Sequence, residues 1–240
     1  MPPYALFNRR LILRTAGMLG AQTLLVNCGG KEAAKSASQD RQVSEMVGST
    51  SEPSQTCLLT PAQVEGPYYL PLNASRTKMA YGQTGISLDV NITVVDQSCQ
   101  PIKGACVEVW HANAQGVYSG FDGQAENTTG QDFLRGEAYS DAEGQVQLKS
   151  IYPGWYPGRA VHVHFKVSLH DSARITSQFY LPDEVSRDVY QAKAYQARGA
   201  QDTPLAQDQF LQRTGEHHPL LVASVTPHLS GYLARLQITI

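Results

Sequence analysis

The stretch Ile86-Ser-Leu-Asp-Val-Asn-Ile-Thr-Val-Val95 alternates apolar and polar side chains along nearly its whole length. Because successive side chains of a β-strand point to opposite faces, this alternation predicts a strand with one buried face and one exposed face. Shorter apolar runs between turn residues occur at residues 105–110, 136–140, 145–151, 160–169, 175–181 and 232–240. This series of short strands predicts an all-β fold, and specifically a β-sandwich.

One segment has the spacing of a helix rather than that of a strand. Residues 183–198 carry apolar side chains at helical intervals, and Asp183 stands where a capping residue is expected. The segment predicts the one sizeable helix, with any other helices short and peripheral. Residues 113–130 are polar and rich in glycine, so they predict a long loop of the kind that carries function.

Length and charge limit the classes of protein to consider. The 240 residues suit one large domain with an appendage, and a domain of roughly 180 residues buries enough surface to fold without a metal or a disulfide. The formal net charge is −2 and the lysines and arginines are scattered. Nucleic-acid binding needs a basic patch, so we expect no nucleic-acid partner.

The first 28 residues resemble an export signal. Arg9-Arg10 precedes a short apolar stretch that ends at Val26, too short to span a bilayer, and the pair resembles a twin-arginine motif. A basic N-terminal helix of the fold is the alternative. Cys28 resembles a lipoprotein cleavage site, although Asn27 is larger than the residue usual before it. The alternative is ordinary signal cleavage nearby.

These features predict an exported protein, in the periplasm or cell envelope, whose membrane contact is limited to the export signal or a lipid anchor. Residues 29–56 have almost no large apolar side chain and predict a flexible tether to a folded domain at 57–240. Three cysteines follow Cys28, and in an oxidising compartment two of them are expected to pair. The pairing is open from sequence, with Cys57–Cys99 preferred over pairs that use Cys106.

The strand at 160–169 carries two histidines two residues apart. His162 and His164 therefore project from one face, while Val161, Val163 and Phe165 face the core. Two imidazoles on one face form a natural pair of metal ligands. Surface histidines on a half-exposed strand are the alternative.

Two tyrosines are placed to join this pair. Tyr156 lies six residues before His162 across a Pro-Gly turn, and Tyr118 lies in the long loop. A phenolate is a hard anionic oxygen donor, which suits Fe(III) better than Zn(II) or Cu(I). The set of two histidines and two tyrosines predicts an Fe(III) site, and the alternative for either tyrosine is a core or rim aromatic.

The chain resembles the intradiol ring-cleavage dioxygenases from about residue 57 to residue 240. Several ordered motifs carry the resemblance, at residues 59–69 (LTPAQVEGPYY), 107–118 (VEVWHANAQGVY), 141–144 (DAEG), 152–157 (YPGWYP), 159–165 (RAVHVHF) and 176–180 (TSQFY). The signal-like N-terminus makes it similar to exported, single-domain members. The family fold is a β-sandwich, in agreement with the strand pattern.

The resemblance implies one Fe(III) per chain, held by Tyr118, Tyr156, His162 and His164. It implies that a catechol-type substrate displaces Tyr156 while Tyr118 stays bound, and that O₂ then cleaves the ring to a cis,cis-muconate-type diacid. Arg159 falls where the family places an arginine beside the substrate ring.

Further positions follow from the same resemblance. Gln178 matches a glutamine that orients a ligand or the substrate, so the implied catalytic residues are Tyr156, Arg159 and Gln178. The expected wall of the substrate pocket, with Arg159, is formed by Pro67, Tyr68, Tyr69 and Trp155.

The sequence departs from the family in two places, one of which is that a signal and tether stand where catechol 1,2-dioxygenases have an N-terminal helical dimerisation segment, and it leaves other readings open. The run between Tyr156 and His162 is shorter than in well-known members, which leaves Tyr152 as a weaker rival ligand. One rival function is a zinc or copper enzyme that uses the two histidines and His111. Another is a tethered binding module with Trp155 and Tyr156 as an aromatic platform, and a catalytically silent family member is a third. The particular catechol and the oligomeric state are open.

Overall fold

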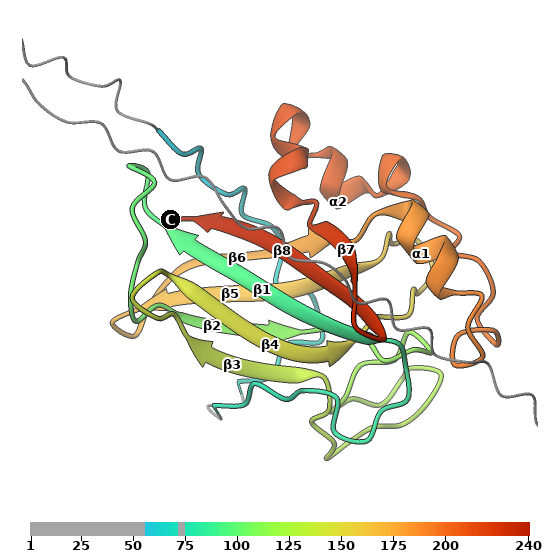
Figure 1. Ribbon diagram of the computed structural model, residues 1–240. Helices are drawn as coiled ribbons and strands as arrows, with labels where there is room; N and C mark the ends of the chain where they lie inside the picture. The colour runs from blue at the N-terminus through green and yellow to red at the C-terminus, as the bar shows by residue number, and fades with distance from the viewer. Residues whose placement is uncertain (1–55, 72–74) are drawn as a thin grey trace, which may run out of the picture. The chain divides into compact units, whose positions relative to one another are not determined.

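The computed structural model describes residues 56–71 and 75–240 (Figure 1). The predicted export signal, Cys28 and the tether up to residue 55 lie outside the described residues. Within the described part of the chain, no helix is long and apolar enough to cross a membrane.

Eight strands form two four-stranded sheets that lie one over the other (Figure 1). One sheet has the order β4-β1-β8-β7, and the other has the order β3-β2-β5-β6. The strands are β1 (Ser87–Val95), β2 (Cys106–Trp110), β3 (Arg135–Tyr139), β4 (Gln145–Ile151), β5 (His162–Leu169), β6 (Ser172–Tyr180), β7 (Ser224–His228) and β8 (Gly231–Thr239). The prediction of an all-β sandwich is confirmed.

Strand β1 has the central position that its alternating sequence requires. It pairs antiparallel with β4 and parallel with β8, which places Ile92 between Val146 and Leu236. The apolar side chains of β1 are buried, whereas Asp89, Asn91 and the other polar ones are partly exposed. The core lies between the sheets, because the buried apolar side chains of both sheets belong to one cluster.

Each of the seven predicted strands is present, with ends that shift by at most three residues. The eighth strand, β7, was not predicted. It is a short edge strand whose residues are mostly exposed and which contains Pro227. A proline is tolerated at a sheet edge because no ladder hydrogen bond needs its missing N–H group. An exposed strand of this kind shows no alternation of apolar and polar residues in its sequence, so the pattern cannot predict it.

The prediction of one helix over residues 183–198 is wrong in length. Helix α1 covers only Asp183–Val189, Pro182 precedes it, and Asp183 lies in its first turn instead of capping it. Tyr190 and Tyr195 are both buried, and their hydroxyls donate to the carbonyls of Pro153 and Tyr152. On a regular helix residues five apart point about 140° from each other, so the chain leaves the helix to bury both rings.

The remaining helical segments lie in the connection between α1 and β7. They are a 3-10 turn at Leu205–Gln207, helix α2 at Gln209–Gln212 and a second 3-10 segment at Gly215–Leu221. Asp208 caps α2, because its carboxylate accepts hydrogen bonds from the amides of Phe210 and Leu211. As predicted, these helices are short and peripheral.

An extended segment, residues 56–71, crosses the edge of the fold and reaches the face where the histidines lie. Its start is joined to the sandwich by the Cys57–Cys99 disulfide. The amides of Thr60 and Gln63 donate to the carbonyls of Thr239 and Thr176. Cys106 forms no disulfide with another described residue. These contacts fix the path of the residues that follow, including Tyr68.

Ile92 gives a direct test of how far this fold depends on strand β1. We expect Ile92→Ala to lower the free energy of unfolding by about 2–5 kcal/mol, because the fully buried side chain leaves a cavity between two strands. The matched variant Asn91→Ala alters the other face of β1 and should change the free energy of unfolding by about 0.5 kcal/mol or less. Urea denaturation measures both, and equal losses would contradict the assignment of the buried face.

Candidate metal centre

The two histidines of β5 are deeply buried on the face of the sheet that points away from the sandwich core. His162 and His164 are 4% and 3% exposed, so they are not surface histidines. Val163 and Phe165 occupy the opposite face and belong to the main apolar cluster. Loops cover the histidine face, and these loops carry the tyrosines.

Four donor atoms converge in front of β5. The Tyr156 hydroxyl oxygen lies 2.9 Å from His162 Nε2, and the Tyr118 hydroxyl oxygen lies 3.4 Å from the same nitrogen. His164 Nε2 is 3.2 Å from His162 Nε2. The structure therefore brings together all four residues that the sequence analysis assigned to a metal.

The tautomer of His162 is assigned from its hydrogen bonds. Its Nδ1 lies 2.7 Å from the carbonyl oxygen of Ala160, which can only accept, so Nδ1 carries the proton and the Nε2 lone pair points at the site. Burial, followed by the charge of Arg159, lowers the pKa of His162 to about 3. Burial also lowers the pKa of His164 well below its usual value, so both rings are neutral.

The donor set fits a cation. At most one proton can lie between the two facing Nε2 atoms, and His164 Nδ1 is buried without a hydrogen-bond partner among the described residues. Burial raises the pKa of Tyr156, and it raises that of Tyr118 well above the usual range, so without a cation both phenols keep their protons. A trivalent cation that replaced those protons would gain two anionic oxygens and two neutral nitrogens, which suits Fe(III).

His111 does not complete a site of three histidines. Its Nδ1 lies 2.8 Å from the carbonyl oxygen of Ala112, and its Nε2 lies 2.7 Å from the Ser150 hydroxyl. Both ring nitrogens are therefore occupied. Across the described residues, no group of three or more His, Cys, Asp or Glu side chains could hold a metal ion. A metal site in front of β5 would therefore need the two tyrosines as well as the two histidines.

The loop that carries Tyr118 is fixed by hydrogen bonds to its backbone. The Gln124 side chain accepts from the Tyr118 amide at 2.8 Å and donates to its carbonyl at 2.9 Å. The Thr128 hydroxyl donates to the same carbonyl at 2.6 Å. The guanidinium of Arg135, which is 3% exposed, donates to the carbonyl and hydroxyl oxygens of Ser119. Tyr118 is thereby held in a single position.

The two tyrosine loops touch at a glycine. A Cβ atom on Gly116 would lie 2.2 Å from the carbonyl oxygen of Trp155, and the backbone there has φ of +76°. Only glycine combines this conformation with this approach. The contact sets the distance between the loop of Tyr118 and the loop of Tyr156.

A row of side chains crosses the sheet beside the histidines. Arg135, Trp110, His164 and Gln178 are neighbours in register on strands β3, β2, β5 and β6. The Trp110 ring is stacked on His164 with centroids 5.1 Å apart. Gln178 is fully buried, and its amide donates to the carbonyl of Val64. These contacts orient the His164 ring.

Arg159 is held at the entrance to β5 by a buried carboxylate. Its Nε donates to Asp208 at 2.8 Å, and its Nη2 donates to Gln178 and to the Tyr180 hydroxyl. The guanidinium also lies over the Phe210 ring. The structure therefore links Arg159, which the resemblance places beside the substrate ring, with Gln178, which it implies orients a ligand or the substrate.

Asp208 and Arg135 are functional candidates that the sequence analysis did not name. Asp208 is fully buried and also accepts from the amide of Ala160, so it fixes both the arginine and the start of β5. Its position before a short helix marks it as a cap, but its partner lies 49 residues away in sequence. No local pattern identifies such a pair.

The expected pocket residues lie in different places. Tyr68 is stacked on Tyr118 with centroids 4.6 Å apart, and it lines a cavity of about 210 Å³ together with Tyr156. Pro67 is exposed on the turn before it. Tyr69 donates to Glu108 and lies under the Lys166 ammonium, away from that cavity.

Trp155, the fourth expected pocket residue, also stands outside the lining of this cavity. Its ring packs under the guanidinium of Arg198, at 4.4 Å from the ring centroid. Arg198 itself does line the cavity. Trp155 therefore contacts the cavity only indirectly, by supporting Arg198. Tyr152, the rival ligand, donates or accepts a hydrogen bond with Ser186 and lies apart from the four donors.

Known proteins are similar to this chain in sequence and in fold. A family model described as dioxygenase matches residues 64–217. Catechol 1,2-dioxygenase 1 of Acinetobacter lwoffii is 30% identical over 144 residues, which are 50% of this chain and 45% of that protein. The protocatechuate 3,4-dioxygenase beta chain of Burkholderia cepacia is 32% identical over 126 residues, 48% of this chain and 54% of that one. This chain thus spans about half the length of these relatives.

Solved structures agree with the sequence matches. The intradiol ring-cleavage dioxygenase from Tetranychus urticae has a TM-score of 0.70 and 25% identity, over 77% of this chain and 95% of that one. The dioxygenase domain of a dioxygenase–carbohydrate-binding protein fusion from Streptomyces sp. SirexAA-E has a TM-score of 0.56 and 24% identity, over 76% and 97% of the two chains, and shows the fold alone.

The fold and the matched family model define the class of protein as a dioxygenase. More specifically, the chain belongs to the intradiol ring-cleavage dioxygenase family, a family of oxidoreductases, which confirms the resemblance found in the sequence.

Gly66 provides a test of the orientation of His164. A Cβ on Gly66 would lie 3.1 Å from His164 Cε1, at a backbone φ of +78°. We expect Gly66→Ala to turn the imidazole and to weaken iron binding by about 10- to 100-fold, as loss of an orienting contact does. The matched control is Gly123→Ala, which has φ of +72° and no atom within 4 Å. Gly123→Ala introduces a similar backbone strain without a contact to His164. Iron titration of both variants therefore separates the effect of strain from the effect of the contact. Equal iron affinities in the two variants would contradict the role of Gly66 in orienting His164.

His111 predicts a pH dependence of stability. Burial lowers its pKa to about 4, below the usual 6.5, so the unfolded chain binds one more proton than the fold between these pH values. Stability should therefore fall as pH drops from 6.5 to 4, by about 3 kcal/mol for this group, and then level off. His111→Gln should lose this part of the dependence and keep the parts from His162 and His164. Urea denaturation of the metal-free protein between pH 4 and 7 measures it, and parallel curves would refute a neutral His111.

Proposed function

We propose that this chain is a non-haem Fe(III)-dependent intradiol dioxygenase that cleaves a catechol-type ring between its two hydroxylated carbons. Both atoms of O₂ enter the product, a cis,cis-muconate-type diacid, as the ring C–C bond breaks and O₂ is reduced. The observation that supports this most is that two phenol oxygens and His164 Nε2 all lie within 3.4 Å of His162 Nε2. The relatives described above, a catechol dioxygenase and a protocatechuate dioxygenase, support the substrate class.

Tyr118, Tyr156, His162 and His164 would hold the iron. When bound, Fe(III) supplies positive charge that lowers the pKa of coordinated phenols and accepts electron density from a chelated catechol, which makes the ring reactive toward O₂. The protein supplies a dry setting, since three of the four residues are less than 5% exposed and Tyr156 is the partly exposed one.

The two tyrosines differ in how firmly they are held, and this difference supports different roles. Tyr118 is 1% exposed, with its backbone fixed by Gln124 and Thr128 and its ring under Tyr68. Tyr156 lines the cavity and is partly exposed. An arriving catechol would displace the ligand that has room to move. The released Tyr156 oxygen would then accept a proton from a substrate hydroxyl, while Tyr118 stays.

Arg159 and Gln178 would act on the substrate side of the centre. Arg159 is fixed through Asp208, so its charge is oriented before substrate arrives and would stabilise negative charge that develops on the ring. Gln178 connects this guanidinium to the row that contains His164. Gln178 would thereby hold Arg159 and His164 in fixed positions relative to each other.

We also propose that the protein is exported from the cytoplasm. The pair Arg9-Arg10 and Cys28 support export to the periplasm or cell envelope, with membrane contact through the signal or a lipid anchor. Export of an already folded protein would allow the metal site to be filled before translocation.

A visible spectrum tests the proposed function. We expect the iron-loaded protein to bind one iron per chain and to show a strong visible band from phenolate-to-Fe(III) charge transfer. The band should shift to longer wavelength when a catechol is added without O₂. Tyr118→Phe should lower iron affinity by about 100-fold or more and abolish ring cleavage, because it removes an anionic ligand.

Tyr152→Phe is the matched control, since it also removes a buried hydroxyl, but one bonded to Ser186. It should keep the iron, the band and the activity. A Tyr118→Phe protein that retained all three would refute the ligand assignment. A wild-type protein that stays colourless after exposure to iron would favour the binding-module alternative.

A further inference from the structure

The cavity beside Tyr156 has a charged wall. It measures about 210 Å³, and its lining includes Tyr68, Gln115, Val117, Tyr156 and Arg198. None of its lining residues is acidic, and Arg198 is its one charged side chain among the described residues. A substituent on a ring held at the metal would enter this cavity as it passed Tyr156 and Tyr68.

Arg198 is firmly positioned by the segment that carries Trp155. Its Nη2 donates to the Trp155 carbonyl oxygen at 2.9 Å, and its guanidinium lies over the Trp155 ring. The indole N–H of Trp155 in turn donates to the carbonyl of Gly199, the residue after the arginine. The ring and the guanidinium therefore fix each other, and the position of the charge is set in advance.

The charge of Arg198 is not neutralised within the described residues. Its Nε is buried and has no hydrogen-bond acceptor, and it takes no part in the four ion pairs between described residues. The polar neighbours are already engaged, because the Gln115 amide donates to Ala194 and the Gln124 amide binds the backbone of Tyr118. Arg159, by contrast, has Asp208 as its partner.

We propose that Arg198 selects catechols that carry an anionic ring substituent, such as a carboxylate. This inference rests on the proposed function, because the two ring hydroxyls must be held at the metal for the substituent to reach the cavity. The planar guanidinium offers N–H groups that match a carboxylate, and an anion would supply the acceptor that its Nε lacks. Trp155 then has a positioning role through Arg198.

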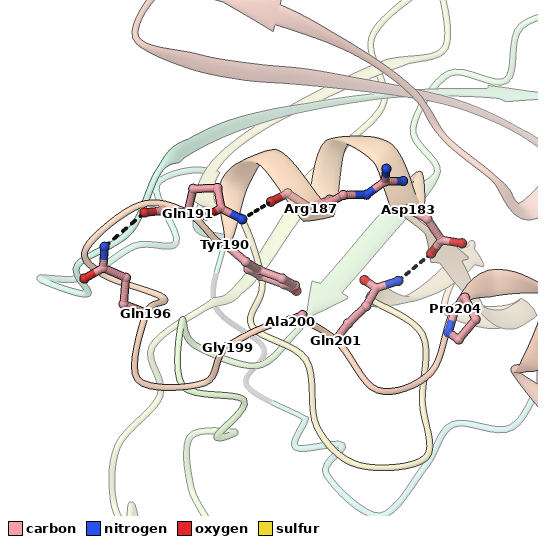
Figure 2. A pocket seen from close by; sticks show the side chains of 9 residues that line it. All are labelled: Asp183, Arg187, Tyr190, Gln191, Gln196, Gly199, Ala200, Gln201 and Pro204. Atoms are coloured by element: carbon pink, nitrogen blue, oxygen red, sulfur yellow. Dashed lines mark hydrogen bonds between the residues drawn. The ribbon is translucent and has the colours of Figure 1, made fainter.

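A second cavity, of about 520 Å³, provides a matched control (Figure 2). Gly199, Ala200 and Gln201, which follow Arg198 in the chain, line it together with residues of α1. Figure 2 shows Arg187 lying along this helix, and Arg187 is exposed and belongs to this lining instead of that beside Tyr156. Arg187→Met removes the same charge from the same region and leaves the wall near Tyr156 intact.

The test compares kcat/KM for 3,4-dihydroxybenzoate with kcat/KM for catechol in the iron-loaded protein. We expect the wild-type protein to favour the carboxylated ring, and Arg198→Met to lower the ratio of the two values by about 10- to 100-fold, mainly through KM. Arg198→Lys keeps the charge but not the planar fork, and it should retain part of the preference. Arg187→Met should keep the wild-type ratio.

Anaerobic titration of the visible band with each catechol gives dissociation constants and shows that each variant is folded and loaded with iron. A wild-type protein that cleaves catechol without preferring the carboxylated ring would overturn this inference and leave the proposed function standing. A ratio that is unchanged in Arg198→Met would do the same. A protein that cleaves neither ring and shows no visible band would overturn the proposed function itself.

Discussion

Two imidazole nitrogens that face each other at 3.2 Å, with two phenol oxygens beside them, set the constraint on which the rest of the site depends. Neutral lone pairs and phenol hydroxyls gathered so closely, and away from water, cannot all be satisfied by one another. A cation between the donors would satisfy the lone pairs that stay unpaired. The β-sandwich allows these donors to lie close together. Strand β5 carries two histidines, two residues apart, on one face, and its other face is packed in the core.

The loops convert this face into an asymmetric site. One tyrosine loop is bonded at its backbone by Gln124 and Thr128, whereas the other ends in a tyrosine that borders a cavity. Close backbone approach at Gly116 keeps the loops in register. Two arginines lie near Tyr156: Arg159 forms an ion pair with Asp208, whereas Arg198 forms no ion pair among the described residues. The surroundings of the two tyrosines, more than their chemical identity, make Tyr118 the firmly held residue and Tyr156 the one beside open space.

The sequence allowed seven of the eight strands and the pairing of His162 with His164 to be predicted, because both follow local rules, whereas the full ligand set with Tyr118 and Tyr156 rested on the family resemblance. Alternation locates β1, and a spacing of two on a strand places His162 and His164 on one face. The length of α1 was not accessible, since it depends on where Tyr190 and Tyr195 find buried hydrogen-bond acceptors. The same holds for Asp208, and for Tyr69 and Trp155, whose outward contacts with Glu108 and Arg198 are tertiary. Edge strand β7 has too little burial to leave a pattern.

The order of the strands has a consequence for how the chain acquires its structure. Strand β8 is the last in sequence, yet it lies between β1 and β7 and pairs with β1 in parallel over eight residues. Until residues 231–239 are available, one edge of β1 stays open and the sheet that backs the histidine-bearing sheet is incomplete. The pairing of β1 with β8 therefore waits until residues 231–239 have been made, and long-range pairing of this kind slows folding. In the interval the open edge of β1 presents unpaired backbone N–H and C=O groups, with which another strand could pair.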